Sequence, residues 1–258
     1  MHKYKLLLVA AVAVLSSFII LKPKEKPTLW LIGDSTVRNG TYGRGDGGLW
    51  GWGSFIQNLF DTTKVSVQNK AFGGTSSRSF WTGGFWSKVE PYIKPGDVVL
   101  IQFGHNDNSP STLRGIGEDS AEVTNPRTKQ TEMVHTFGWN LRKYIRETRA
   151  KGGTPIILTL VPRNMWKDGK VDRVAAEYVE WDKQVAAQEK VDVIDLNKII
   201  ADHYDELGRD KVMAEYFTPK DHTHTIEAGA KFNAACVVEG LKGLKRDPLK
   251  KFYLDNRN

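Results

Sequence analysis

The chain has 258 residues, of which 40% are hydrophobic and 26% are charged. That composition excludes an intrinsically disordered protein, and the length suits one large domain. The formal net charge of +7 favours anionic partners, but no nucleic-acid-binding motif accompanies it. A single cysteine, Cys236, excludes an intramolecular disulfide and a metal site built from several thiolates.

The N-terminus has the pattern of a targeting segment. Basic residues precede the apolar stretch Leu6–Leu21, and lysines follow it. This is the shape of a signal peptide, although no clear small-x-small cleavage site follows the apolar core. We therefore expect residues 1–26 to be either a cleaved signal peptide or a retained N-terminal anchor. In both cases the folded part is exported, and it contacts a membrane only if the segment is retained.

Apolar runs predict the strands and amphipathic patterns predict the helices. The strands expected are Leu29–Ile32, Val65–Asn69, Asp97–Phe103, Pro155–Val161 and Val191–Leu196. Most of these runs are continuous, as in parallel strands buried on both faces. The helices expected are Ser54–Phe60, part of Trp86–Ile93, Val134–Ala150, Val174–Lys190, Leu196–Leu207 and Glu227–Leu244. The alternation predicts a three-layer α/β/α sandwich around a five-stranded parallel sheet.

Two long loops follow predicted strands. Gly43–Gly53 is rich in glycine, and Asn108–Thr131 is a long polar insertion. Loops of this length usually carry function or are disordered, and their position places them at the ligand-binding edge of the sheet. No second domain is expected: residues 27–246 form the folded domain and residues 247–258 a basic tail.

Four polar blocks lie at the predicted edge. Gly33–Thr36, Asn69–Ser76 and Gly104–Asp107 follow the first three strands, and Asp221–His224 precedes the last helix. Open α/β sheets bind ligands outside the carboxyl ends of their strands, so we expect these blocks to meet.

The residue types in these blocks are those of nucleophilic catalysis. The Ser35 hydroxyl needs a base, which His224 can supply, and Asp221 can fix the His224 tautomer. An oxyanion needs donors, for which the candidates are the Ser35 and Gly74 N–H groups and the Asn106 side-chain amide. Gly73 is an alternative to Gly74 as the glycine that donates its N–H group to the oxyanion.

Each of these residues also has a simpler interpretation. Ser35 could be a helix N-cap, and Asn106 could cap a turn. We expect Asp34 to hold the Ser35 turn and His105 to pack or orient its block, rather than to act on substrate. Asp221, His222 and His224 could hold a metal ion, but their spacing suits the serine chemistry better.

Taken together, the four blocks resemble those of SGNH (GDSL-type) hydrolases over roughly residues 28–244. Thr36, the Gly104–Asp107 block and the Asp221–Thr225 block further resemble the rhamnogalacturonan acetylesterase subgroup. The resemblance implies a flavodoxin-like sheet, no metal and no cofactor. It also implies that Ser35, Asp221 and His224 are catalytic, with Ser35, Gly74 and Asn106 forming the oxyanion hole.

The substrate that the resemblance implies is an acetylated, anionic polysaccharide or oligosaccharide. Arg78, Trp81, Arg163 and Trp166 lie near predicted strand ends and are the candidate substrate-binding residues. We predict an exported serine esterase that removes O-acetyl groups from rhamnogalacturonan. The alternatives are an acetylxylan, other carbohydrate, lipid or thioester esterase of the same superfamily, and a catalytically silent carbohydrate-binding protein.

Overall fold

The computed structural model describes residues 25–39, 45–107, 112–125, 129–173 and 176–254. The N-terminal segment 1–24, the first residues of the glycine-rich loop and part of the polar insertion lie outside the described residues. Within the described residues no helix is both long and apolar enough to cross a membrane.

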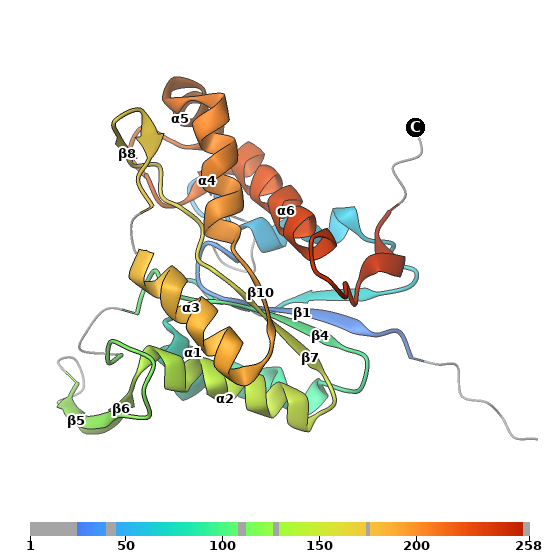
Figure 1. Cartoon of the computed structure of the whole chain (residues 1–258), viewed down its shortest axis with the longest axis vertical. Helices are drawn as coiled ribbons and strands as arrows, with labels where there is room; N and C mark the ends of the chain where they lie inside the picture. The colour runs from blue at the N-terminus through green and yellow to red at the C-terminus, as the bar shows by residue number, and fades with distance from the viewer. Residues whose placement is uncertain (1–24, 40–44, 108–111, 126–128, 174–175, 255–258) are drawn as a thin grey trace, which may run out of the picture.

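A five-stranded parallel sheet forms the centre of the molecule (Figure 1), in the order β10-β7-β4-β1-β3. Its strands are β1 (Thr28–Gly33), β3 (Ser66–Asn69), β4 (Val98–Gln102), β7 (Thr154–Leu158) and β10 (Asp192–Ile194). All five predicted strands are confirmed, with bounds that differ by a few residues. In β1, Leu29 and Leu31 pack on one face of the sheet, and Trp30 and Ile32 on the other.

Helices cover both faces of this sheet. One face carries α1 (Ser77–Thr82), α2 (Phe137–Ala150) and α3 (Ala176–Glu189), and the other carries α4 (Leu196–Leu207), α5 (Arg209–Tyr216) and α6 (Glu227–Lys242). The predicted three-layer α/β/α sandwich is thereby confirmed. Short ribbons complete the fold: β2 (Leu49–Trp50) pairs with β11 (Thr225–Ile226), β5 (Ser120–Thr124) with β6 (Thr131–His135), and β8 (Trp166–Lys167) with β9 (Lys170–Val171).

Several helix predictions were wrong in type or length. The stretch Ser54–Phe60 forms short 3₁₀ turns at Trp52–Ser54 and Ile56–Leu59 instead of an α-helix. The stretch Trp86–Ile93 is likewise divided into 3₁₀ turns at Trp86–Lys88 and Glu90–Tyr92, because Pro91 lacks an N–H and disfavours the helical conformation of the residue before it.

The long helix predicted from Val134 begins later than expected. Thr136 is its N-cap, since its hydroxyl accepts a hydrogen bond from the Trp139 N–H, and Val134 belongs to β6. β5, the first strand of the β5–β6 hairpin, lies within the insertion that was expected to be a loop. Two helices, α1 and α5, were not predicted; both are short.

Candidate active site

Ser35 lies in a tight turn at the carboxyl end of strand β1, which lies between β4 and β3 in the sheet. The Asp34 carbonyl accepts hydrogen bonds from the N–H groups of Val37 and Arg38, at 3.2 and 3.0 Å. The Asp34 carboxylate, fully buried, accepts from both the N–H and the hydroxyl of Thr36, each at 2.8 Å. Asp34 therefore holds the Ser35 turn, as expected.

A second turn brings Asp221 and His224 to Ser35. One Asp221 oxygen accepts the N–H groups of Thr223 and His224, at 2.7 and 2.8 Å, and the other lies 2.8 Å from His224 Nδ1. His224 Nε2 is in turn 2.8 Å from Ser35 Oγ. The chain after His224 is fixed by β11, which pairs with Trp50 and Leu49 of the glycine-rich loop. Residues predicted from separate blocks thus form one continuous hydrogen-bonded row.

The charge state of Asp221 determines how protons are placed along this row. Burial raises the pKa of the Asp221 carboxyl, but hydrogen bonds from the His224 backbone and ring outweigh burial and hold that pKa below its ordinary value. Asp221 is therefore ionised at neutral pH and accepts the proton on His224 Nδ1. The other ring nitrogen, Nε2, is then left to accept the Ser35 hydroxyl proton.

Hydrogen-bond donors lie on the glycine segment beside Ser35 and on the segment bonded to it. Gly74 has a φ of +77° and open space where a Cβ would lie, whereas a Cβ on Gly73 would be 3.7 Å from the Ser35 Cβ. Among the described residues, the Ser35 and Gly74 N–H groups have no protein acceptor. Asn106 Nδ2 donates one hydrogen bond to the Thr75 carbonyl at 3.1 Å, which leaves its second N–H for a ligand.

The four candidate substrate-binding residues have different surroundings. The Arg78 side chain is buried and forms an ion pair with Glu132 on β6. Trp81 and Trp166 donate their indole N–H groups to Asn140 and Asn164, at 2.8 and 2.7 Å. Arg163 is half-buried, with no hydrogen-bond or ion-pair partner for its guanidinium among the described residues.

Arg163 lies close enough to His105 for its charge to act on that ring. Burial lowers the pKa of His105, and the Asp34 carboxylate opposes this effect, so the buried ring is neutral at pH 7.

Two residues near Ser35 were missed in the sequence. Arg38, in the Ser35 turn itself, has a guanidinium with no partner among the described residues. Phe72, just before the two glycines, exposes 48% of its surface and stacks on Phe85 with ring centroids 4.2 Å apart. The sequence signal that could have found Phe72 is an aromatic residue directly before a glycine pair.

Asp221, His222 and His224 do not form a metal-ligating group in the described part of the chain. Among the described residues, the side chains whose ligand atoms lie close enough together to hold a metal ion are His203 on α4 and Cys236 and Glu239 on α6. In that group His203 Nε2 already lies 2.9 Å from a Glu239 carboxylate oxygen.

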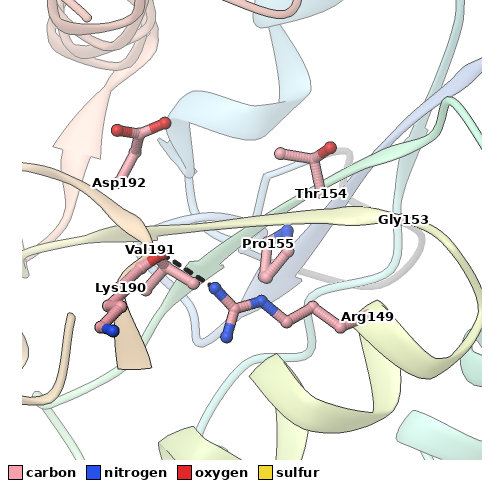
Figure 2. Close-up of a pocket in the computed structure, with 7 residues that line it drawn as sticks. All are labelled: Arg149, Gly153, Thr154, Pro155, Lys190, Val191 and Asp192. Carbon is pink, nitrogen blue, oxygen red and sulfur yellow. Dashed lines mark hydrogen bonds between the residues drawn. The ribbon is translucent and has the colours of Figure 1, made fainter. Parts of the chain in front are cut away.

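A hollow of about 210 Å³ lies at the opposite edge of the sheet, at the amino ends of β7 and β10 (Figure 2). Its lining includes Arg149, whose guanidinium donates to the Lys190 carbonyl at 2.8 Å. None of the four polar blocks contributes to this hollow.

Comparison with known proteins places the chain in a family. The profile of the GDSL-like Lipase/Acylhydrolase family matches residues 31–231. The chain is 30% identical over 234 residues to a rhamnogalacturonan acetylesterase of Emericella nidulans, covering 88% of this chain and 89% of that protein. It is 32% identical over 219 residues to YesY of Bacillus subtilis, a probable rhamnogalacturonan acetylesterase, covering 84% of this chain and 93% of YesY.

A solved structure agrees with these matches. The crystal structure of YxiM from Bacillus subtilis superposes with a TM-score of 0.67 at 28% identity, covering 85% of this chain. The chain spans 57% of the length of that structure. The profile match, the two relatives and the shared fold agree, and the chain therefore belongs to the GDSL-like Lipase/Acylhydrolase family and is a carboxylic ester hydrolase.

Proposed function

We propose that this chain is a serine esterase that removes O-acetyl groups from rhamnogalacturonan by way of an acetyl-enzyme on Ser35. The observation that carries the proposal is the hydrogen-bonded row of Ser35, His224 and Asp221 beside two N–H groups without acceptors. A nucleophile, a base and oxyanion donors within one site are what acyl transfer requires.

The reaction follows from this geometry. Ser35 Oγ attacks the acetyl carbonyl carbon while His224 Nε2 takes the hydroxyl proton. The carbonyl electron pair moves onto oxygen, which the Ser35 N–H, the Gly74 N–H and the Asn106 amide stabilise. When the tetrahedral intermediate collapses, the sugar oxygen leaves with the proton from His224. Water, deprotonated by His224, then attacks the acetyl-enzyme. When this second intermediate collapses, acetate leaves and His224 returns the proton to Ser35 Oγ.

Charge near Ser35 supports an anionic polymer as substrate. Arg38 and Arg163 each present a guanidinium without a partner among the described residues, and the formal net charge of the chain is +7. A guanidinium binds a carboxylate in bidentate fashion, and rhamnogalacturonan carries one on each galacturonate. The exposed ring of Phe72 offers an apolar face for a sugar ring. The two relatives named rhamnogalacturonan acetylesterases point to the same polymer.

The proposed compartment is outside the cytoplasm. The basic and apolar pattern of residues 1–26 is that of a signal peptide or anchor, and a polysaccharide of this kind is an extracellular substrate.

Acetate release from acetylated rhamnogalacturonan, homogalacturonan and xylan tests both the reaction and the substrate. We expect the fastest release from rhamnogalacturonan, and the Ser35→Ala variant to lose nearly all release from each polymer while keeping the wild-type circular dichroism spectrum. Release by Ser35→Ala would refute the role of Ser35. Faster release from xylan would identify an acetylxylan esterase, and no release from any polymer would favour a binding protein.

A further inference from the structure

Asp107 is a buried carboxylate that lies outside the Ser35–His224–Asp221 row. Its side chain is 1% exposed and accepts hydrogen bonds from three separate segments of the chain. The Ser77 N–H lies 3.0 and 3.1 Å from its two oxygens, and the Ser77 hydroxyl also donates to it. The Gly104 N–H and the Thr112 hydroxyl donate to it at 3.1 and 3.3 Å.

These bonds join the two segments that supply the oxyanion donors. Ser77 begins the helix that directly follows the Gly74 turn, and Asp107 directly follows Asn106. A second bond, from Asn106 Nδ2 to the Thr75 carbonyl at 3.1 Å, joins the same segments nearer to Ser35. The Gly74 N–H and the Asn106 amide are therefore held on segments connected at two points.

Two tyrosines hold this connection from the neighbouring helices. The Tyr144 hydroxyl on α2 donates to the Ser77 carbonyl at 2.5 Å, and the Tyr178 hydroxyl on α3 donates to the Asp107 carbonyl at 2.6 Å. The hydroxyls thus fix the backbone at both ends of the Asp107–Ser77 contact.

We propose that Asp107 is a positioning residue that sets the separation between the Gly74 N–H and the Asn106 amide. The proposal rests on the proposed function, in which those two groups bind the oxyanion. Oxyanion stabilisation depends on donors that are already in place before charge develops, so a clamp between their segments acts on the transition state more than on bound substrate.

The ionised form of Asp107 suits this role. Burial raises the pKa of Asp107 to about 6 although the Ser77 hydroxyl and N–H lower it, and at neutral pH the carboxylate is still ionised. An ionised carboxylate is an acceptor at every position, which matches the donors around it. The Asp34 carboxylate in the Ser35 turn also raises the pKa of Asp107. The Asp107 carboxylate in turn raises the pKa values of Tyr144 on α2 and of Tyr178 and Asp182 on α3.

Asp107→Asn tests the clamp, with Asp97→Asn as its matched control. Asp97 is also fully buried and accepts three hydrogen bonds, from the Thr28 N–H at 2.7 Å, the Trp30 indole at 3.0 Å and the Lys94 N–H at 3.2 Å. It precedes the same strand, β4, at the edge away from Ser35. Both variants lose a buried carboxylate, but only Asp107→Asn loses it beside the segments that carry the oxyanion donors.

The kinetic readout is turnover of p-nitrophenyl acetate per active site, with sites counted by stoichiometric phosphorylation with diethyl p-nitrophenyl phosphate. For Asp107→Asn we expect kcat to fall by about 10- to 100-fold with KM within about threefold of wild type. For Asp97→Asn we expect a lower melting temperature but kcat within about twofold. If Asp107→Asn loses melting temperature and keeps kcat, the residue is only structural and the proposal is wrong.

Two further measurements keep the test decisive. If Asp107→Asn does not fold, Ser77→Ala removes one donor to the same carboxylate and is expected to lower kcat about threefold or more; unchanged kcat there refutes the clamp. Hydrogen exchange of the full-length protein does not depend on activity. Residues 72–77 should exchange about tenfold faster in Asp107→Asn than in Asp97→Asn. If the wild type releases no acetate, the proposed function fails, and equal exchange in the two variants then refutes the clamp.

Discussion

At the scale of single residues, the site depends on contacts between parts of the chain far apart in sequence. Ser35 and His224 are separated by 189 positions, yet Ser35 Oγ lies 2.8 Å from His224 Nε2. Local turns prepare each partner: Asp34 holds the Ser35 turn, and Asp221 accepts the N–H groups that follow it. The pairing of β11 with β2, and the hydrogen bonds from the glycine-rich loop to the Ser35 turn, then hold the two turns together.

The pH dependence of stability should reveal the buried Asp107 carboxyl. Its pKa is about 6 in the folded protein against an ordinary value of 3.8, so between these pH values the folded state binds the extra proton. This contribution to stability is fully present below pH 3.8 and is lost as pH rises through 6. We therefore predict that the wild type gains about 2 kcal/mol relative to Asp107→Asn between pH 7 and pH 4.

Urea unfolding of both proteins at pH 4 and pH 7 measures this difference directly. Acids that do not interact with Asp107 are common to the two proteins, so their effects cancel in the comparison. A wild-type advantage that is the same at both pH values would mean that Asp107 is not titrating in the folded state near pH 6.

Sequence motifs located the reacting residues but not all of their neighbours. Ser35, Asp221, His224, Gly74 and Asn106 were predicted because serine chemistry requires those groups and because their blocks resemble those of a known family, and the structure brings them together. The surroundings of Arg78 could not be predicted, since its partner Glu132 lies on a hairpin that has no strong strand pattern in the sequence.

At the scale of structural elements, the glycine-rich loop packs against the Ser35 turn. The Trp52 and Gly53 N–H groups donate to the carbonyls of Thr36 and Val37, both at 3.0 Å. A Cβ on Gly51 would lie 2.4 Å from the Val37 carbonyl carbon and 2.5 Å from the Arg38 nitrogen. The loop can make this close approach to the backbone only because Gly51 has no side chain.

Gly51→Ala should therefore disturb both the stability of the protein and its active site. The backbone atoms that a new methyl group would meet cannot rotate away, so we expect a melting temperature lower by about 5 °C and a reduced kcat. Gly243→Ala is the control, because its Cβ would lie 3.4 Å from the nearest atom, the Gly240 carbonyl oxygen, at an ordinary φ of −77°. Equal melting temperatures for the two variants would contradict this account of the loop.

Element predictions succeeded where the pattern was long and failed where it was short. The helix Leu196–Leu207 was predicted at its observed bounds, and the structure shows that Asp195 caps its start and Gly208 follows its end. The 3₁₀ turns near Trp52 and Trp86 contain too few residues to distinguish a tight turn from an α-helix by periodicity.

At the scale of the whole molecule, the candidate active site and the start of the first strand lie at opposite ends of the parallel strands. The strands run in one direction, so the residues after β1, β3 and β4 all gather at one edge. The chain enters β1 at Thr28, at the amino ends of the strands. At the same ends, Thr154 at the start of β7 lines the hollow in Figure 2. If residues 1–26 are an anchor, they join the folded domain at the amino end of β1, and Ser35 lies after the carboxyl end of the same strand.

The central claim is that Ser35 carries the acetyl group during turnover, and rapid acid quenching followed by mass spectrometry tests it most directly. During hydrolysis of p-nitrophenyl acetate, the peptide containing Ser35 should gain the mass of one acetyl group in the wild type. The same peptide should stay unmodified in Ser35→Ala. We expect Asp221→Asn to slow acylation, so the acetylated peptide should form more slowly in that variant than in the wild type. Steady turnover with no acetyl group on Ser35, or with one on another residue, would contradict the mechanism.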